Sequence, residues 1–408
     1  MGYSANAIKG ISWMGALRIV IRSIAIVRIA MLARLLTPSQ FGLFGIASLA
    51  LSFVEIFTET GINIFLVKIK HEIKDYVTSA WIVSICRGIL ISTSILLVAP
   101  VISSFFRSSD AINIIRLIAV APLIRGFINP AIIQFQKRLQ FQKEFLFRIV
   151  LYFTEAAVAI ILVMITRSVY SLVWALIVSA IFEVFLSFFF LQTKPNFHIE
   201  AKKIKEIIKQ GKWITLTGIF NYLFHNGDNI IVGRMLGVTA LGYYDTAYKI
   251  SMLPITEVGN VVQQVTLPVY SQIYTDKHRL WRAFIKTLIG VSLLTVPLGV
   301  IFLLFPNQLV MLFLGSKWLP VVPVLQVLTI FGVVRAISGT PSSLFYAIGK
   351  ETYVTVVTLI SFLALAITIV PFIYWFGLLG AGYSAIFATF AAIPVIVYYL
   401  FIVFRVEN

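Results

Sequence analysis

The chain has 408 residues, of which 60% are hydrophobic and only 12% are charged. This composition excludes an ordinary soluble globular domain, in which about a quarter of the residues carry charge. The formal net charge of +17 does not indicate a nucleic-acid partner, because membrane proteins collect Lys and Arg in their cytoplasmic loops and this chain distributes them in that way.

Apolar runs recur from one end of the chain to the other, and each has the length of about 20 residues that crosses a bilayer as a helix. They predict an all-α fold, a polytopic membrane protein of about 12 transmembrane helices. The helices are expected at residues 8–33, 41–66, 76–106, 112–136, 146–166, 169–192, 212–236, 243–273, 283–305, 321–348, 353–376 and 379–404.

The first predicted span carries Arg18, Arg22 and Arg28 inside its apolar run. A guanidinium near the bilayer centre costs about 2.5–3.5 kcal/mol. At about 100° per residue, the three side chains share one broad face of a helix. Snorkelling toward the two interfaces explains Arg18 and Arg28 taken singly, but it explains Arg22 poorly because Arg22 lies deeper. The pattern favours a cationic cavity that binds an anion such as phosphate, which Arg contacts bidentately.

Prolines and acids interrupt several later spans. Pro122 and Pro130 remove backbone hydrogen bonds inside the span at 112–136, where a kink serves either as a hinge or as a static bend. An intramembrane Glu either neutralises an Arg and fixes helix packing or takes part in a cation path. We assign Glu55 and Glu257 to a coupling or cavity role. The other intramembrane acids open to both interpretations are Glu59, Glu155 and Glu183.

One long polar segment, residues 193–211, separates two halves of the chain. It is rich in Lys and is predicted to be a cytoplasmic amphipathic helix. It joins an N-terminal six-helix lobe, residues 1–192, to a C-terminal six-helix lobe, residues 212–408.

The two halves also resemble each other in sequence. A near-constant offset relates several residues, which favours parallel, pseudo-symmetric repeats around a central site, a transporter architecture. Adding 200 relates Arg34 to Arg234 and Gly42 to Gly242, and adding 210 relates Arg125 to Arg335.

Basic residues are divided unequally between the two sides of the predicted membrane. About 20 lie in the loops of one side and about 5 in those of the other, so the richer side, which includes both termini, is predicted to be cytoplasmic. The basic residues that remain lie within spans or near their ends: Arg18, Arg22, Arg28, Arg87, Arg116, Arg125, Lys249 and Arg335. Besides the three in the first span, Arg125, Arg335 and Lys249 are further candidate ligands for an anionic substrate.

The seventh predicted span has a polar face. Asn221, His225 and Asp228 are spaced i, i+4 and i+7, so they lie on the same side of a helix. Ionisable groups inside a membrane mark ion or substrate paths, which favours a cavity wall or a cation site; interhelical hydrogen bonding is the other interpretation. No further Cys or His cluster supports a metal site, and none is expected.

Two motifs carry a resemblance to a known family. They are LARLLTPSQFGLF, from Leu32 to Phe44, and DNIIVGRMLGVTALGYYDTA, from Asp228 to Ala247. With them the chain resembles the oligosaccharide (O-antigen, Wzx-type) flippases, the polysaccharide-export branch of the superfamily that includes the multidrug MATE exporters. The likeness extends over nearly the whole chain.

The resemblance implies a MATE-like pair of six-helix lobes in the bacterial inner membrane, with both termini cytoplasmic. Such proteins move undecaprenyl-diphosphate-linked oligosaccharides to the periplasmic leaflet for lipopolysaccharide and other surface polysaccharides. It also implies that cavity arginines contact the diphosphate and that transport is coupled to H+ or Na+. A polysaccharide polymerase and chain-length proteins are the implied partners. Asp228 occupies the family's acidic position.

Two alternative functions compete with that of a flippase. A MATE-type multidrug exporter takes cationic drugs and is expected to have an acidic, aromatic cavity, whereas the first span here carries three arginines. A membrane glycosyltransferase or ligase that uses the same lipid carrier is expected to have a large external loop with catalytic acids, and the predicted external loops are short. We therefore expect no catalytic residues and a transporter rather than an enzyme.

Overall fold

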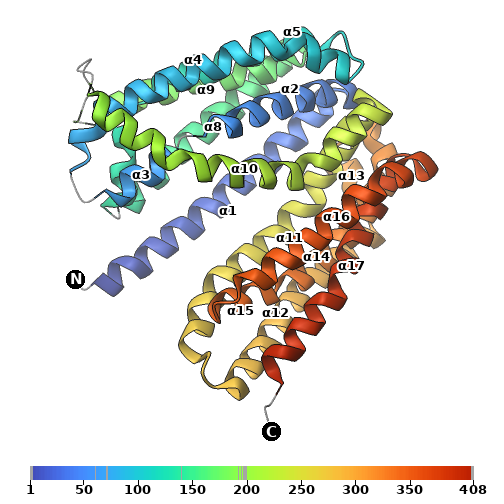
Figure 1. The fold of residues 1–408 in the computed structure, drawn as a ribbon. Helices are drawn as coiled ribbons and strands as arrows, with labels where there is room; N and C mark the ends of the chain where they lie inside the picture. Colours follow the sequence, from blue (N-terminus) through green and yellow to red (C-terminus); the bar gives the residue numbers. More distant parts are fainter. Residues whose placement is uncertain are drawn as a thin grey trace. The chain divides into compact units, whose positions relative to one another are not determined.

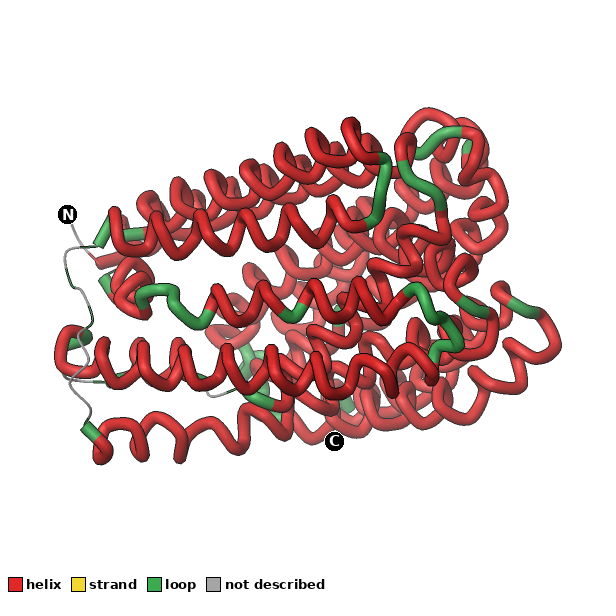
Figure 2. Tube along the Cα trace, turned by 90° about the horizontal axis from the view of Figure 1, so that it is seen from above, coloured by secondary structure: helices red, strands yellow, loops and turns green. Residues whose placement is uncertain are grey.

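The computed structural model describes residues 3–405, apart from residues 60, 70, 71, 139, 192, 194 and 196–199. Every regular element in this part of the chain is a helix, and none of the described residues forms a strand (Figure 2). The prediction of an all-α fold is therefore confirmed.

The chain divides into two compact units, Met1–Ile230 and Ile231–Asn408 (Figure 1). The helices of the first unit are α1 (Tyr3–Leu35), α2 (Pro38–Phe57), α3 (Ile62–Lys68), α4 (Lys74–Phe105), α5 (Ala111–Ile118), α6 (Val120–Arg125), η1 (Pro130–Ile133), α7 (Gln134–Lys137), α8 (Phe141–Thr166), α9 (Tyr170–Phe189) and most of α10 (Ala201–Leu236). The helices of the second unit are α11 (Val238–Ile273), α12 (Lys277–Leu304), α13 (Pro306–Phe313), η2 (Ser316–Val321), α14 (Val322–Gly339), α15 (Pro341–Ala347), α16 (Glu351–Phe376) and α17 (Leu378–Phe404).

Helices long and apolar enough to cross a membrane account for much of the described chain. There are eight of them, or nine if the bent pair Ala111–Arg125 and Pro130–Lys137 is one broken span. Three helices outside this set, α1, α10 and α11, have 33, 36 and 36 residues, which is more than a bilayer requires. That α1, α10 and α11 also cross the membrane, which would give about 12 spans in all, stays a prediction.

The second and fourth predicted spans are interrupted, which corrects the continuous helices expected at 41–66 and 112–136. The first interruption follows Phe57, where Gly61 adopts a positive φ of 64° and its N–H donates to the Glu59 carboxylate at 3.1 Å. The second separates α6 from η1, and the two parts are bent by 71°. Pro130 begins η1 and cannot donate a backbone hydrogen bond.

Buried side chains satisfy the backbone at the interruption between α6 and η1. The Trp81 indole N–H donates to the carbonyl oxygen of Phe127 at 3.0 Å, and the Asn129 N–H donates to the Ser187 hydroxyl at 3.0 Å. The Asn129 side chain accepts from the N–H of Ala131 at 3.0 Å. These bonds compensate the polar groups that a break exposes within a membrane-spanning segment.

The same helix pairings recur inside each unit. In the first unit α5 packs against α2, α6 packs against α4 and α9, and α8 packs against α9. In the second unit α14 packs against α11, α12 and α17, and α16 packs against α17. The recurrence of these pairings in the same chain order agrees with the parallel, pseudo-symmetric repeats predicted from the sequence.

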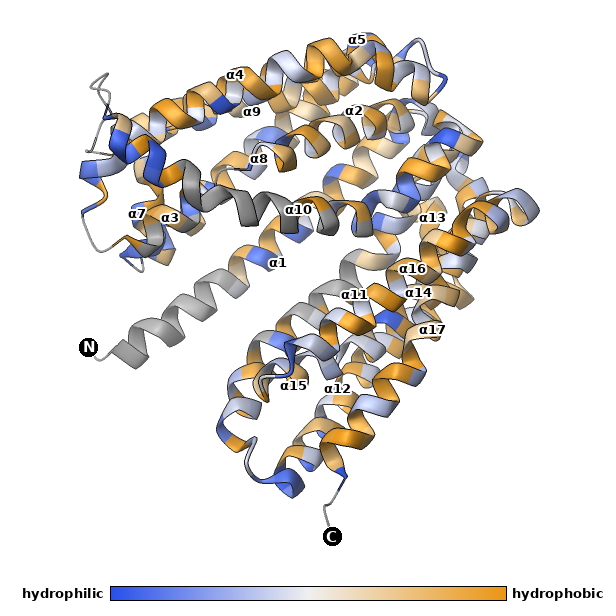
Figure 3. Cartoon of the chain, viewed as in Figure 1, coloured by the Kyte–Doolittle hydropathy of each residue, from blue (hydrophilic) through white to orange (hydrophobic). Residues whose placement is uncertain are grey.

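Of the segment predicted as a linker, residues 194 and 196–199 lie outside the described residues, and residues 201–211 form the start of α10, which runs on to Leu236. Figure 3 shows hydrophilic residues at this start of α10. Ile207 is buried with side chains of α3 and α4, and the Tyr76 hydroxyl donates to Glu206 at 3.0 Å. The start of α10 thus packs inside the first unit, while the lobe boundary predicted at residue 212 stays a prediction.

Candidate functional site

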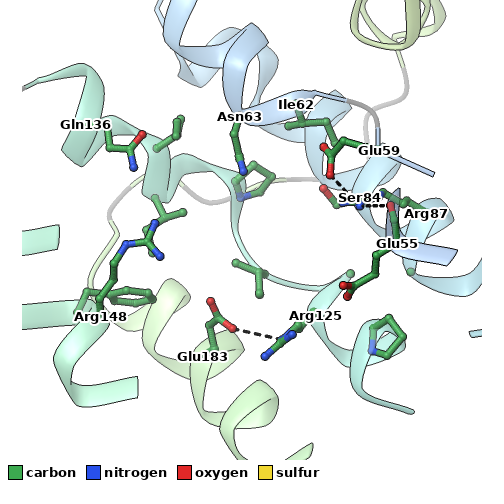
Figure 4. Close-up of a pocket in the computed structure, with 18 of the residues that line it drawn as sticks. Glu55, Glu59, Ile62, Asn63, Ser84, Arg87, Arg125, Gln136, Arg148 and Glu183 are labelled. Carbon is green, nitrogen blue, oxygen red and sulfur yellow. Dashed lines mark hydrogen bonds and ion pairs between the residues drawn. The ribbon is translucent and has the colours of Figure 1, made fainter. Parts of the chain in front are cut away.

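A charged cavity of about 370 Å³ lies within the first unit (Figure 4). Side chains of α2, α3, α4, α6, α7, α8 and α9 enclose it, together with the interruption between α6 and η1. Its polar lining consists of Glu55, Glu59, Asn63, Ser84, Arg87, Arg125, Gln136, Glu144, Arg148 and Glu183.

Two glycines let the helices around the cavity approach closely. A Cβ atom at Gly88 in α4 would lie 2.6 Å from the carbonyl oxygen of Pro122 and 3.1 Å from the Cα atom of Gly126. Small residues at helix crossings permit such contacts in membrane proteins. This crossing places Arg87, next to Gly88, and Arg125, next to Gly126, on the wall of the same cavity.

Arg87 holds the carboxyl end of α2. Its Nη2 donates to the backbone oxygen of Glu55 and to Glu59 Oε2, both at 3.0 Å. The backbone carbonyls at the end of a helix lack partners within the helix, so a guanidinium at this place satisfies one of them. Arg87 Nε is buried and has no hydrogen-bond partner among the described residues.

Arg125 and Glu183 join α6 to α9 across the cavity. Arg125 Nε lies 3.7 Å from Glu183 Oε2, and the two side chains are 36% and 25% exposed. Figure 4 shows the two side chains pointing toward each other. The pair is consistent with the interpretation that intramembrane glutamates neutralise intramembrane arginines.

Glu144 occupies the first turn of α8 and is only 5% exposed. Its Oε1 accepts hydrogen bonds from Gln136 Nε2 at 2.7 Å and from Arg148 Nε at 2.9 Å. Its Oε2 is buried and has no hydrogen-bond partner among the described residues.

A second cavity of about 250 Å³ shares Arg125, Arg148 and Glu183 with the first and adds Glu155 to its lining. Arg28 of α1 forms an ion pair with Glu155 of α8 at 2.5 Å. One face of α8 therefore lines both cavities with polar side chains, at residues Glu144, Arg148, Tyr152 and Glu155.

The basic residues predicted to bind an anion have different surroundings. Arg28 and Arg125 form the ion pairs just described, and Lys249 pairs with Asp245 at 2.6 Å. Arg335 donates to the Tyr248 hydroxyl at 3.3 Å and lies over the ring of Phe331. Both Arg18 and Arg22 are half-buried on α1.

The residues predicted to couple transport to a cation lie in different surroundings. Glu55 lines the charged cavity. Asp228 is 6% exposed and accepts a hydrogen bond from the N–H of Asn229 at 2.8 Å, whereas His225 is exposed. The side chains of Asn221 and Glu257 lie outside the described residues, so their predicted roles have no structural description.

Sequence reasoning did not assign Arg87, Glu144 or Arg148 to a site. Arg87 is predicted only as one of the basic residues that lie within spans or near their ends. The i, i+4 spacing of Glu144 and Arg148 at the start of an apolar run was the available signal, because such pairs meet on one helix face.

The charges of the larger cavity nearly balance. Its lining includes three guanidinium groups, those of Arg87, Arg125 and Arg148. It also includes four carboxylates, those of Glu55, Glu59, Glu144 and Glu183. In the described part of the chain no group of three His, Cys, Asp or Glu side chains is placed to hold a metal ion.

A family model described as "Polysaccharide biosynthesis protein" matches residues 31–323. The Escherichia coli lipopolysaccharide biosynthesis protein WzxC is 23% identical over 354 residues, which are 85% of this chain and 71% of that protein.

Solved structures share the fold. The lipid II flippase MurJ in an inward closed conformation superposes with a TM-score of 0.77 at 14% identity, over 96% of this chain and 87% of that one. A MATE-family multidrug resistance transporter in an inward-facing conformation gives a TM-score of 0.72 at 16% identity, over 95% and 98% of the two chains. The MATE-like fold and the multi-pass membrane class are therefore confirmed.

Proposed function

This chain belongs to the polysaccharide biosynthesis protein family, and from that premise we propose that it flips a lipid-linked oligosaccharide across the membrane. The match over residues 31–323 is the observation that carries the proposal. The likeness to WzxC supports a substrate from surface polysaccharide biosynthesis. The chain then moves its substrate between leaflets and makes or breaks no covalent bond in it.

The proposed substrate is an undecaprenyl-diphosphate-linked oligosaccharide. Its diphosphate brings at least two negative charges to a membrane-depth site, where arginine can offer bidentate hydrogen bonds. Arg22, half-buried on α1, is our first candidate ligand. Arg18 assists it from the same face. Arg28 and Arg125 form ion pairs with Glu155 and Glu183.

Transport is proposed to be coupled to a cation gradient, H+ or Na+. Two acids support this part of the proposal: Glu55 lines a charged cavity, and Asp228 is buried within the polar segment of α10. Ionisable groups within membrane spans commonly mark ion or substrate paths.

The proposed location is the bacterial inner membrane, with both termini in the cytoplasm and oligosaccharide delivered to the periplasmic leaflet. A polysaccharide polymerase and chain-length proteins are the proposed partners downstream. The unequal distribution of basic residues between loops supports this orientation.

A multidrug exporter of the same fold is the second candidate. The observation in its favour is the excess of carboxylates over guanidinium groups in the first unit's cavity, since an acidic cavity suits cationic drugs. The arginines of α1 argue against it.

Deletion of the gene in its native host tests the proposed function. We expect the lipid-linked repeat unit to accumulate in the cytoplasmic leaflet and surface polysaccharide to disappear. Expression of the parental chain should remove the accumulated repeat unit and restore the surface polysaccharide. Unchanged surface polysaccharide would refute the flippase, and unchanged polysaccharide with new sensitivity to cationic drugs would favour the exporter.

A further inference from the structure

The start of α12 presents a basic face to the surroundings of the second unit. The spacing of Arg279, Arg282 and Lys286 places them within about 60° of one another around the helix, and all three are exposed. The opposite side of this part of α12 is buried, at Leu280 and Phe284. Figure 3 shows hydrophilic residues at this start of the helix. We call the three exposed residues the basic stripe.

Beyond Lys286 the same face of α12 is apolar. Ile289 lies seven residues after Arg282, and Leu293 lies seven residues after Lys286, so both continue the basic stripe along the helix. Five exposed aliphatic side chains form this row: Ile289, Leu293, Val296, Val300 and Leu304. One helix face therefore combines three cations with a row of aliphatic side chains.

The charges of the basic stripe are not balanced within the second unit. Among the described residues, no carboxylate forms an ion pair with Arg279, Arg282 or Lys286. Arg282 Nε donates to His278 Nε2 at 3.0 Å, which positions the guanidinium but brings no negative charge. The Asp276 carboxylate accepts from the backbone N–H of Arg279 at 2.9 Å and so caps the helix. An anion outside the chain would balance these cations.

The length of α12 places the basic stripe at the membrane surface. The helix has 28 residues and is apolar enough to cross a membrane, whereas about 20 residues cross the hydrocarbon core. Its first turns therefore extend to the level of the lipid headgroups, which the long side chain of Lys286 also reaches. Trp281 is 42% exposed and packs against Phe404 with ring centroids 4.7 Å apart. Exposed tryptophans are typical of this level of a membrane.

We propose that the face of α12 from Arg279 to Leu304 binds an anionic phospholipid. The phosphate contacts Arg279, Arg282 and Lys286 through charge-assisted hydrogen bonds, and the acyl chains lie along the aliphatic row. Clusters of Lys and Arg beside a membrane span attract anionic headgroups in this way. Orientation in the membrane requires only that basic residues lie on one side of it. It does not explain why these three share one helix face that continues as exposed aliphatic side chains.

Lipid binding at this face does not rest on the proposed function, so it is tested without oligosaccharide. The purified full-length chain in detergent micelles binds a fluorescent phosphatidylglycerol, which serves as the probe. Unlabelled phosphatidylglycerol should displace the probe at a lower concentration than zwitterionic phosphatidylcholine does. High salt should reduce this difference, because it screens exposed charges. Glycerol phosphate, which has no acyl chains, should not displace the probe at the same concentration.

The chain supplies a matched control in Lys277. This cation lies in the same turn of α12 but outside the basic stripe, and its Nζ donates to the backbone oxygen of Arg405 at 3.1 Å. We expect Arg282→Gln to weaken phosphatidylglycerol binding about fivefold and Arg279→Gln/Arg282→Gln about twenty-five-fold. Lys277→Gln loses the same charge as Arg282→Gln and should bind like the parental chain. Arg282→Lys should retain most of the binding, and melting temperatures check that each variant is folded.

Equal displacement of the probe by phosphatidylglycerol and by phosphatidylcholine would overturn the proposal. Equal binding by the parental chain and Arg279→Gln/Arg282→Gln would also overturn it. The same loss in Lys277→Gln as in Arg282→Gln would reduce the effect to net charge and refute a specific face. Displacement by glycerol phosphate would assign this face to a free phosphate. Displacement by undecaprenyl diphosphate at a much lower concentration than by phosphatidylglycerol would assign it to the lipid carrier, and either result refutes the phospholipid.

Discussion

Arg28 and Arg22 lie on the same helix, but the structure gives them different surroundings. Arg28 forms an ion pair with Glu155, and the side chains are 22% and 13% exposed. Arg22 is half-buried farther toward the N-terminus of α1. We therefore expect Arg28 to act mainly through helix packing. Arg22, which lies deeper in the predicted span, stays our candidate ligand for the substrate.

Removing one member of the Arg28–Glu155 pair should destabilise the chain. Arg28→Leu leaves the Glu155 carboxylate buried without its cation, at a cost of about 3 kcal/mol. The double variant Arg28→Leu/Glu155→Leu should regain most of the stability, because replacing a whole buried pair by apolar side chains is often neutral. The melting temperatures of the purified variants measure this. A double variant as unstable as Arg28→Leu would contradict the pairing.

Substitution of Arg22 should affect transport more than folding. A charge-assisted hydrogen bond is worth about 1.5–3 kcal/mol, so Arg22→Ala should weaken binding of the carrier diphosphate about tenfold or more. Arg22→Lys keeps the charge but loses the planar fork and should retain partial export. Arg34→Ala, at the exposed end of α1, is the control. Parental export by Arg22→Ala would move the anion site to Arg335 or Lys249.

The sequence predicted which charged residues lie within the membrane spans, but not which of them pair with each other. The cost of membrane charges singled out Arg28 and Glu155, but their separation of 127 positions gave no way to pair them. Glu144 was missed because it stands at a predicted loop edge. Its burial depends on Gln136, Arg148 and the neighbouring helices, and it cannot be predicted from spacing alone.

Among the elements, the crossing of α4 and α6 governs the shape of the charged cavity. The contact depends on the absence of a Cβ atom at Gly88, which would otherwise meet the carbonyl oxygen of Pro122 at 2.6 Å. Gly88 itself lines the cavity. A bulkier residue would separate the helices that carry Arg87 and Arg125.

Gly88→Ala should therefore destabilise the first unit by about 1–3 kcal/mol, the usual cost of overpacking. Gly290 lies in α12, which packs against α14 in the second unit. It has no atom within 4 Å of an added Cβ. Gly290→Ala should be neutral or stabilising by about 0.5–1 kcal/mol, because Ala favours a helix over Gly. Melting temperatures that fall equally in both variants would argue against a specific contact at Gly88.

The positions of the helices were largely predictable, because the thickness of the bilayer sets the length of an apolar span and basic residues mark the loops. The interruptions within the spans were harder to predict. Pro130 indicated a break, but the 71° bend also depends on Trp81, Asn129 and Ser187, which meet only in the folded chain. Gly61 follows Thr58 and Glu59 in a short polar stretch, and this stretch was the available signal for a break between α2 and α3.

For the whole molecule, orientation in the membrane is the property that the helices alone do not determine. The excess of basic residues predicts that Lys205, near the start of α10, lies in the cytoplasm and that Ser316, at the start of η2, lies on the opposite side. Reporter fusions at these two residues should give opposite signals. The same signal from both would show that the number of spans between them is even, against the prediction.

Direct observation of flipping by the purified chain tests the central claim most directly. The parental chain and Arg22→Ala would be reconstituted into liposomes with a fluorescent undecaprenyl-diphosphate oligosaccharide, and a membrane-impermeant quencher would follow its arrival in the outer leaflet. We predict that quenching proceeds faster with the parental chain than in protein-free liposomes, and that Arg22→Ala falls close to the protein-free rate. Identical rates with and without the folded parental chain would contradict the account.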